Sequence, residues 1–339
     1  MYINWEYLIE LTLSDNRKLK VTRAESVMIT QELYYPEKRF EICLGDAFGR
    51  MLSKDSGVVL RGSVVCVWFG YGGHMELLAQ GDVMRMTTER GVLKLICRGT
   101  CYNVLKERCF DGVSVLGERI TYRTWLGELT GYEVETHIRD LETDRLRVNP
   151  MNVYNLLLEL QREMLYVVEQ TDGERCWLEL FDTDSDYSKR DVRKIELTRY
   201  DKDVLKLNDM ALKKSLSWHG LNVPCGVKLT GITRENRVYV KEKRDNNFTG
   251  FSKQKRVYVD DADELKELCD YEFERMHWSG YSGYVELLGV PLVKVGDLVE
   301  LTEDGRFAGS YMIDKVVFTM INSRVRQRIY LCTTIEPPQ

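Results

Sequence analysis

The chain has 339 residues, of which 44% are hydrophobic and 30% are charged, and its formal net charge is −5. This composition is that of a globular protein of two or three domains, and the acidic balance argues against a dedicated nucleic-acid binder. The N-terminal segment has no basic stretch ahead of an apolar one, and no apolar run approaches about 18 residues, so neither a signal peptide nor a membrane-spanning helix is predicted.

Residues 1–107 carry the patterns of short antiparallel strands. Apolar and polar side chains alternate from residue 7 to 13, and Asp15-Asn16 predict a hairpin turn after this strand. The segments 64–69 and 92–97 are apolar on both faces, as expected for strands that are covered on two sides. Short strands joined by Gly-bearing turns are typical of a small closed barrel, so we expect a first β-barrel hub domain here.

Residues 108–200 combine helices and strands. Thr121 is placed to cap a short helix that Gly131 ends, and Asn152 is placed to cap a stronger amphipathic helix. A hairpin is predicted to turn at Asp172-Gly173. We therefore expect an α+β insertion domain over this range.

Residues 201–339 return to strands, after a highly charged stretch at 182–205 that indicates a linker or an exposed strand. Strands are predicted at 226–232 and 237–243, and a loop and a helix capped by Asp260 or Asp261 are inserted at about 244–280. Further on, the apolar phase of the strand 311–320 slips, which predicts a β-bulge near Asp314-Lys315. These patterns predict a second β-barrel domain.

Two segments about 240 residues apart share the same order of elements. Each opens with a Gly (Gly62 and Gly296), passes a short apolar strand and a Gly-rich turn, and continues with a strand led by Gly81 or Gly309. A polar turn and a final apolar strand close both segments. The predicted fold class is therefore α+β and β-rich, with two similar small antiparallel β-barrels and an α+β insertion between them.

The residue types that carry chemistry do not gather in a recognisable pattern. The four His lie far apart, the spacing of Cys97, Cys101 and Cys109 lacks the paired knuckles of a zinc site, and residues 70–73 lack the Lys-Ser/Thr of a phosphate loop. The nine Cys are scattered, which favours reduced thiols and synthesis in a cytoplasm. We predict no catalytic, cofactor or metal site and no enzymatic activity.

Three passages carry a resemblance to a known family. They are residues 61–105, with Gly-led strands before a helix; residues 152–178, with an amphipathic helix before a hairpin; and residues 284–331, with a Gly, Pro, Gly and Val pattern before a final pair of strands. The pattern of the last passage is formed by Gly289, Pro291, Gly296, Val299, Gly309, Tyr311, Ile313 and Val316. In the order of its elements the chain resembles the hub proteins of phage contractile-tail baseplates, a group that includes tail protein D-like hubs and the N-terminal part of secretion-system spike proteins.

This resemblance implies a structural protein that is made in a bacterial cytoplasm and assembled into a virion tail baseplate or a tail-like particle. It implies a homotrimer whose partners are the tail spike protein, a tail tube or tube-initiator protein and, as a further candidate, the tape-measure protein, with DNA only as passing cargo and no membrane insertion. Two similar barrels in each of three chains give six modules, a pseudo-sixfold ring that can join a sixfold tube to a threefold spike. An acidic channel wall would repel that DNA.

The candidate residues of the trimer interface are apolar positions on the outer phase of the strands, with ordinary barrel core as the alternative for part of the set. They are Val65, Trp68, Val83, Leu298, Met312 and Tyr330.

Two other classes of function stay open. One is a small-barrel module that binds oligonucleotides or glycans through aromatic residues such as Trp68, Phe69 and Tyr71. The other is an enzyme whose site is assembled from distant residues, such as His137 with Asp140 or Cys109. Within the structural class, the sequence does not separate a contractile phage from a long-tailed phage, a tailocin or an injection system.

Overall fold

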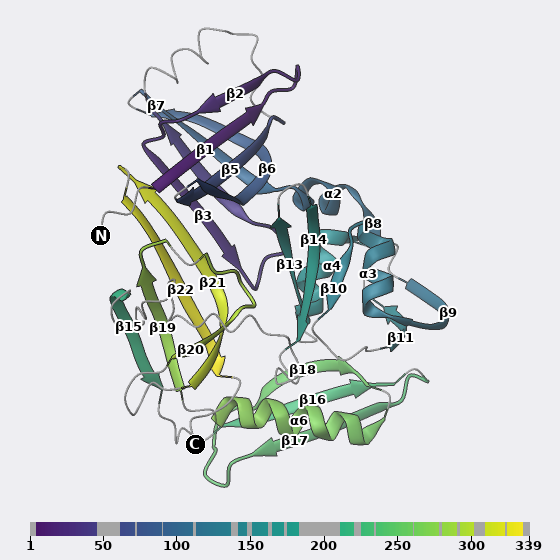
Figure 1. Cartoon of the computed structure of the whole chain (residues 1–339). Coiled ribbons are helices and arrows are strands. Elements are labelled where there is room, and N and C mark those ends of the chain that lie inside the picture. Colours follow the sequence, from purple (N-terminus) through teal and green to yellow (C-terminus); the bar gives the residue numbers. More distant parts are fainter. Residues whose placement is uncertain are drawn as a thin grey trace.

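The structure, a computed structural model, describes residues 5–45, 62–71, 73–89, 91–110, 113–136, 142–147, 151–161, 165–172, 175–182, 211–219, 225–233, 235–259, 261–277, 280–289, 292–301, 309–322 and 324–334. In this part of the chain strands outnumber helices, and one large sheet dominates (Figure 1). An α+β unit lies beside the large sheet, and a smaller unit with a long helix lies below both in this view.

The large sheet combines strands from both ends of the sequence. From the N-terminal third come β1 (Trp5–Thr12), β2 (Lys18–Val21), β3 (Ser26–Glu32), β4 (Arg39–Leu44), β5 (Val64–Tyr71), β6 (His74–Glu89) and β7 (Val92–Gly99). From the C-terminal third come β15 (Ala211–His219), β19 (Gly280–Leu287), β20 (Leu298–Leu301), β21 (Gly309–Ile321) and β22 (Arg324–Thr334). The strands follow the order β15-β19-β22-β21-β3-β4-β7-β6-β5-β1-β2, with β20 paired to β21.

The predicted duplication is present as a repeated strand topology. In the first copy the order is β3-β4-β7-β6-β5, and in the second it is β15-β19-β22-β21-β20. In chain order, each copy has two strands and then an antiparallel meander of three strands. The last strand of the meander pairs with the second strand of the same copy, as β7 pairs with β4 and β22 pairs with β19. The β-rich α+β fold class with two similar antiparallel units is confirmed. The units were predicted as small closed barrels, whereas the described strands of both units form one open sheet that runs from β15 to β2. The two units are joined edge to edge, because β21 of the second pairs with β3 of the first.

The hairpin turns form where the sequence favours positive φ. Asn16 has a φ of 64° in the turn between β1 and β2, and the backbone N–H of Arg17 donates to Asp15 Oδ1 at 3.1 Å. Tyr71 pairs with His74 across the tight turn between β5 and β6. Both turns were predicted, since Asn and Gly reach these conformations at little steric cost.

The middle of the chain forms the α+β unit. Its elements are α2 (Cys101–Glu107), β8 (Cys109–Phe110), β9 (Val113–Thr121), α3 (Tyr122–Thr130), β10 (Val134–Thr136), β11 (Glu142–Arg147), β12 (Met151–Asn152), α4 (Val153–Leu160), β13 (Leu165–Asp172) and β14 (Arg175–Asp182). The predicted caps are confirmed: Thr121 and Asn152 each accept a hydrogen bond from the backbone N–H three residues on, and Gly131 ends α3 at a φ of 72°. Leu126, Leu157 and Leu178 belong to its hydrophobic core. Most of the stretch 182–205 lies outside the described residues.

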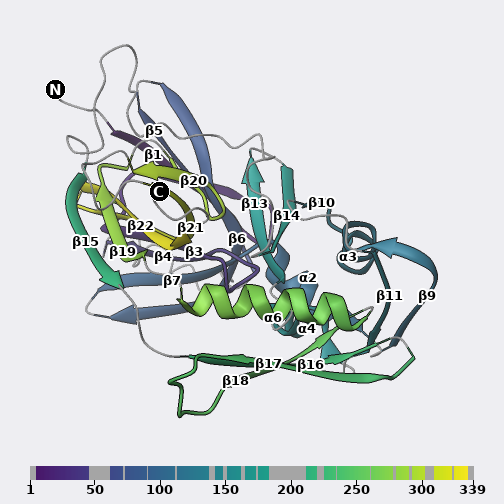
Figure 2. The same ribbon diagram turned by 90° about the horizontal axis from the view of Figure 1, so that it is seen from below.

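The smaller unit is inserted between β15 and β19. It consists of β16 (Gly226–Ile232), β17 (Val238–Arg244), β18 (Lys253–Tyr258) and α6 (Ala262–His277), which covers one face of the three-stranded sheet (Figure 2). The Asp261 cap is confirmed, because Asp261 Oδ1 accepts from the N–H groups of Asp263 and Glu264. The loop predicted to begin near residue 244 was too long. Its last residues form β18, which pairs in parallel with β16 and could not be recognised locally.

The hydrophobic cores cross the predicted domain boundaries. Phe318, Met320 and Val325, from the C-terminal strands, pack in the core of the first β unit. In return, Leu33 and Phe181 pack in the core of the second unit. The boundaries at residues 107 and 200 stay a prediction, but packing alone does not divide the chain there.

Candidate assembly surfaces

The two β units share a backbone hydrogen-bond pattern at their leading glycines. The Gly62 N–H donates to the Val83 carbonyl at 3.1 Å, and the Val83 N–H donates to the Ser63 carbonyl at 2.9 Å. In the second unit the Gly296 N–H donates to the Ile313 carbonyl at 2.8 Å, and the Ile313 N–H donates to the Asp297 carbonyl at 2.9 Å. Both glycines have positive φ, 81° and 90°. The duplication therefore extends to equivalent single residues.

This pattern corrects the residue match drawn from the sequence. If Gly81 is equivalent to Gly309, Val83 of the first unit is equivalent to Tyr311 of the second. The hydrogen bonds instead make Val83 equivalent to Ile313, two residues further on. A register shift follows each matched residue, between Val83 and Arg85 on one side and between Ile313 and Lys315 on the other. The β-bulge predicted near Asp314 is thus confirmed, and the first unit has its counterpart at Met84.

A continuous pairing joins the two units. β21 and β3 pair antiparallel from Lys315 opposite Glu32 to Ile321 opposite Ser26. On the inner face of this junction Phe318 packs edge-on against Phe69, with 4.8 Å between the ring centroids. Buried aromatic packing and continuous strand pairing hold the two units in one fixed relation.

The outer face of this sheet carries a ladder of cross-strand ion pairs. Glu286 pairs with Arg328 at 2.7 Å, Glu32 with both Arg39 and Lys315 at 2.9 Å, and Glu41 with Lys94 at 2.6 Å. Each pair links neighbouring strands, and together they reach from β19 to β7. This ladder was not predicted from the sequence. Its signal was the charged residues at alternate positions of strands whose other positions are apolar.

A buried polar cluster fastens the α+β unit to the first β unit. The Lys38 ammonium donates to Thr171 Oγ1 at 2.9 Å and to the Leu78 carbonyl at 3.1 Å, while the Glu169 carboxylate accepts from the thiols of Cys101 and Cys176 at 3.4 Å. Burial lowers the pKa of Lys38 to about 8 and raises the pKa of Glu169. Burial also raises the pKa of both thiols, so neither is activated as a nucleophile. This cluster therefore serves packing.

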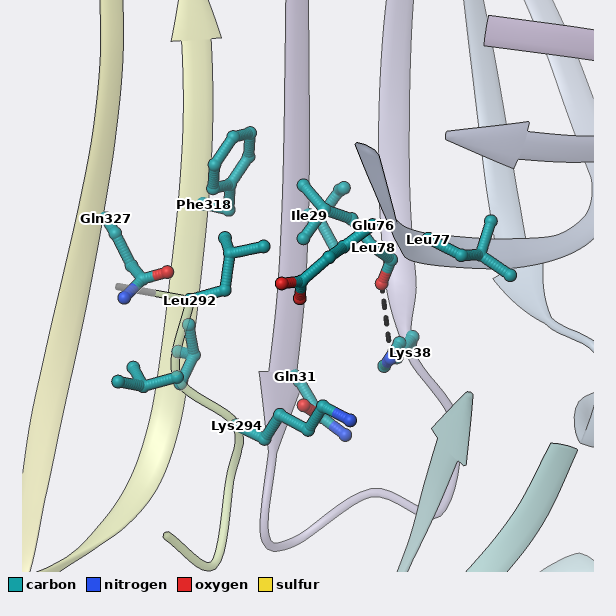
Figure 3. Close-up of a pocket in the computed structure, with 12 residues that line it drawn as sticks. Ile29, Gln31, Lys38, Glu76, Leu77, Leu78, Leu292, Lys294, Phe318 and Gln327 are labelled. Atoms are coloured by element: carbon teal, nitrogen blue, oxygen red, sulfur yellow. Dashed lines mark hydrogen bonds between the residues drawn. The ribbon is translucent and has the colours of Figure 1, made fainter. Parts of the chain in front are cut away.

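A small cavity lies where the two β units meet (Figure 3). Its volume is about 50 Å³ and its lining includes Gln31, Lys38, Glu76, Lys294 and Gln327. Figure 3 shows the ammonium of Lys38 turned to the Leu78 carbonyl. Since one water molecule needs about 10–15 Å³, the space suits a few waters between polar side chains.

Of the six predicted interface residues, some are buried inside the chain and others lie on its surface. The side chains of Val65, Val83 and Met312 are 0%, 1% and 3% exposed and belong to the interior of the chain, so they offer no surface to a second chain. Trp68 and Tyr330 are half-buried on the outer face of the large sheet and stay predictions. The backbone of Leu298 pairs with that of Met312, and its side chain lies outside the described residues.

The residues weighed for chemistry are not brought together. Cys97 and Cys101 are buried and Cys109 is exposed, and no group of three or more His, Cys, Asp or Glu within the described residues is arranged to hold a metal ion. His137 and Asp140 lie outside the described residues. Among the helices that the structure describes, none is long and apolar enough to cross a membrane.

The fold is similar to that of proteins with solved structures. No family model and no curated protein matches the sequence. Among solved structures, the chain is similar to a tail protein from Neisseria meningitidis, with 16% identity, a TM-score of 0.64 and 96% of both chains covered. It is also similar to the 43 kDa tail protein of prophage MuSo2 from Shewanella oneidensis, with 14% identity, a TM-score of 0.61 and coverage of 96% of this chain and 98% of that one.

A chain of a PdpA–VgrG complex shares the same fold. It matches with 10% identity and a TM-score of 0.56, covering 100% of this chain and 67% of that one. At these identities the likeness shows the fold and not a shared activity. It confirms the resemblance drawn from the sequence: over nearly its whole length, the chain has the fold of prophage tail proteins.

Proposed function

We propose that the chain is a structural hub component of a phage tail or a phage-tail-like injection particle. In this role three copies form a pseudo-sixfold ring that joins the tail tube to the central spike. The observation that carries the proposal is the repeated β unit, in a chain whose fold matches tail proteins from end to end.

The duplication gives the ring its symmetry. One chain supplies two units with the same strand order and the same Gly–strand hydrogen bonds, so three chains supply six similar modules. A ring of this kind presents six similar surfaces to a sixfold tube and keeps threefold symmetry for a spike. A spike partner is supported by the likeness to a chain of the PdpA–VgrG complex.

The proposed role needs a rigid body and no reaction. The β3–β21 pairing and the ion-pair ladder fix the two units relative to each other, while the Glu169 and Lys38 cluster fastens the α+β unit. Rigidity lets one chain set the positions of two modules at once. The proposed partners are further copies of the chain, the spike protein, the tube or tube-initiator protein and the tape-measure protein, with DNA as passing cargo in the finished particle.

The first test is the mass of the protein in solution, by light scattering over a range of protein and salt concentrations. A particle near three times the 39.6 kDa chain mass, stable on dilution, is the expected result. A chain that stays monomeric alone and together with its spike protein would overturn the hub. Binding to oligonucleotides or glycans by such a monomer would then favour the small-barrel binding module.

A further inference from the structure

The outer face of the large sheet is basic, although the chain as a whole is acidic. On β19, β22, β21, β3, β4 and β7 the outward positions hold seven bases: Arg39, Lys94, Arg98, Lys315, Arg324, Arg326 and Arg328. The same positions hold three acids, Glu32, Glu41 and Glu286. We call this surface the basic sheet face. The ion-pair ladder uses all three acids, and the buried Glu37 pairs with Arg98 at 2.6 Å. Seven bases therefore meet four acids, and the face keeps an excess of positive charge.

An apolar patch lies on the same surface. Ile321 is 54% exposed and Met28 is 40% exposed, and they occupy adjacent strands beside Arg324, which pairs with Ile321 in the strand register. Exposed aliphatic side chains surrounded by charged ones are typical of a protein interface, in which apolar contact supplies affinity and charge selects the partner.

The complementary charge lies in the smaller unit. Between residues 260 and 277 the sequence has eight acids and two bases. Asp270 and Glu272 pair within the unit, with Lys243 at 2.7 Å and with Lys255 at 2.9 Å. Asp263 and Glu267 are exposed one turn apart on α6, beside the exposed Lys266. Like charges at this spacing repel each other, so a basic partner would stabilise this part of the helix.

The two surfaces are on separate elements of one chain. In Figure 1 α6 lies with its own sheet below the large sheet. A ring of identical chains closes through head-to-tail contacts, in which two different surfaces of the same protein meet. We infer that the basic sheet face of one copy binds the acidic α6 of the next copy. This inference rests on the proposed trimeric ring and names the two surfaces that close it.

The test reverses charges that the in-chain ladder does not use. A sheet variant carries Arg324→Glu and Arg85→Glu, both at exposed positions; Arg85 lies on β6 at the edge of the basic sheet face, paired with Ile96 of β7. A helix variant carries Asp263→Lys and Glu267→Lys. A control variant carries Lys18→Glu and Arg123→Glu, two exposed bases elsewhere on the chain. We expect the sheet and helix variants to associate roughly 100-fold more weakly than the original chain, because like charges then meet at the contact. The control should stay trimeric, and circular dichroism checks the folding of all three.

Mixing gives the decisive result. In an equal mixture, both contacts between unlike variants join opposite charges. The acidic helix of the sheet variant meets the basic face of the helix variant, and the reversed face of the sheet variant meets the reversed helix of the helix variant. The expected products are mixed complexes that contain both variants, seen by native mass spectrometry under conditions in which neither variant associates alone. A single chain with all four substitutions should recover the trimer, since both charges are reversed together.

The outcomes separate the two proposals. If the original chain is a trimer and both variants stay trimeric, the surfaces are wrong and the hub stands. If folded variants are monomeric but their mixture gives no mixed complex, the contact is not head-to-tail between these faces. If the original chain is monomeric even with its spike protein, both proposals fail. Weakening of the trimer by salt up to about 1 M supports the charged contact, and a salt-independent trimer contradicts it.

Discussion

At the residue scale, the two leading glycines have the same backbone conformation in different surroundings. Gly62 and Gly296 have φ values of 81° and 90°. A Cβ on Gly62 would meet nothing within 4 Å, whereas a Cβ on Gly296 would lie 2.4 Å from the ring of Phe181. Position 62 therefore favours glycine only because of its backbone conformation. Position 296 favours glycine for the same reason and also because a larger side chain would clash with Phe181.

This pair gives a matched prediction. Gly62→Ala should lower the free energy of unfolding by about 1–2 kcal/mol, the cost of a left-handed conformation for an L-residue. Gly296→Ala adds a steric clash in the core and should lower it by about 2–5 kcal/mol. Urea unfolding followed by tryptophan fluorescence measures both. Equal losses would show that the contact with Phe181 contributes nothing.

Asp314 occupies the bulge of β21, and one oxygen of its carboxylate is unsatisfied. Its Oδ1 is buried and has no hydrogen-bond partner among the described residues, and burial raises its pKa from 3.8 to about 6. Lys315 lowers this pKa and Glu32 raises it, and both effects are smaller than that of burial. The folded state therefore binds the proton of the Asp314 carboxyl more tightly than the unfolded state does. The stabilisation that this proton gives is fully present below pH 4 and is lost as the pH rises through 6.

Asp314→Asn should remove that pH dependence. The free energy of unfolding of the variant should exceed that of the original chain by an amount that grows as the pH rises from 4 to 6. The difference should reach on the order of 2 kcal/mol and stay constant above pH 6. Thermal unfolding at several pH values measures the difference. Asp172→Asn, at an exposed hairpin end, is the control and should change little at any pH. A constant difference across this range would contradict the assignment to Asp314.

At the element scale, the sequence predicted what depends on neighbours along the chain. Thr121, Asn152 and Asp261 were recognised as caps because a cap needs only a side-chain oxygen near the next turn. The bulge at Asp314 was visible as a slip in the apolar phase. The strand β18 was missed because Lys253–Tyr258 are mostly polar and become a strand through parallel pairing with β16.

The smaller unit has a hydrophobic core of its own, which gives a prediction at this scale. Leu265 is buried between α6 and the three-stranded sheet, together with Leu229 and Val257. Leu265→Ala should destabilise this unit by about 2–5 kcal/mol. Hydrogen exchange should then quicken in β16, β17, β18 and α6, while the amides of β3 and β21 keep their protection. Equal quickening in the large sheet would show that the unit does not unfold separately.

At the scale of the whole molecule, the candidate surfaces depend on contacts that no local pattern contains. The family resemblance and the repeated order of elements predicted two similar β units, and the structure shows them. The pairing of β21 with β3 brings Lys315 to Glu32 across more than 280 positions of sequence. Val65 was predicted at an interface because a strand that is apolar on both faces does not reveal which face meets the core.

The repeated unit also makes a prediction about the image of the proposed ring. Because each chain carries two units with the same topology, averaged electron-microscopy views down the axis should show six lobes of similar density. The smaller unit occurs once per chain, between β15 and β19, and should add a threefold feature. Three lobes in the original particle would mean that the two units lie at different radii, and the duplication would then not act as a symmetry adaptor.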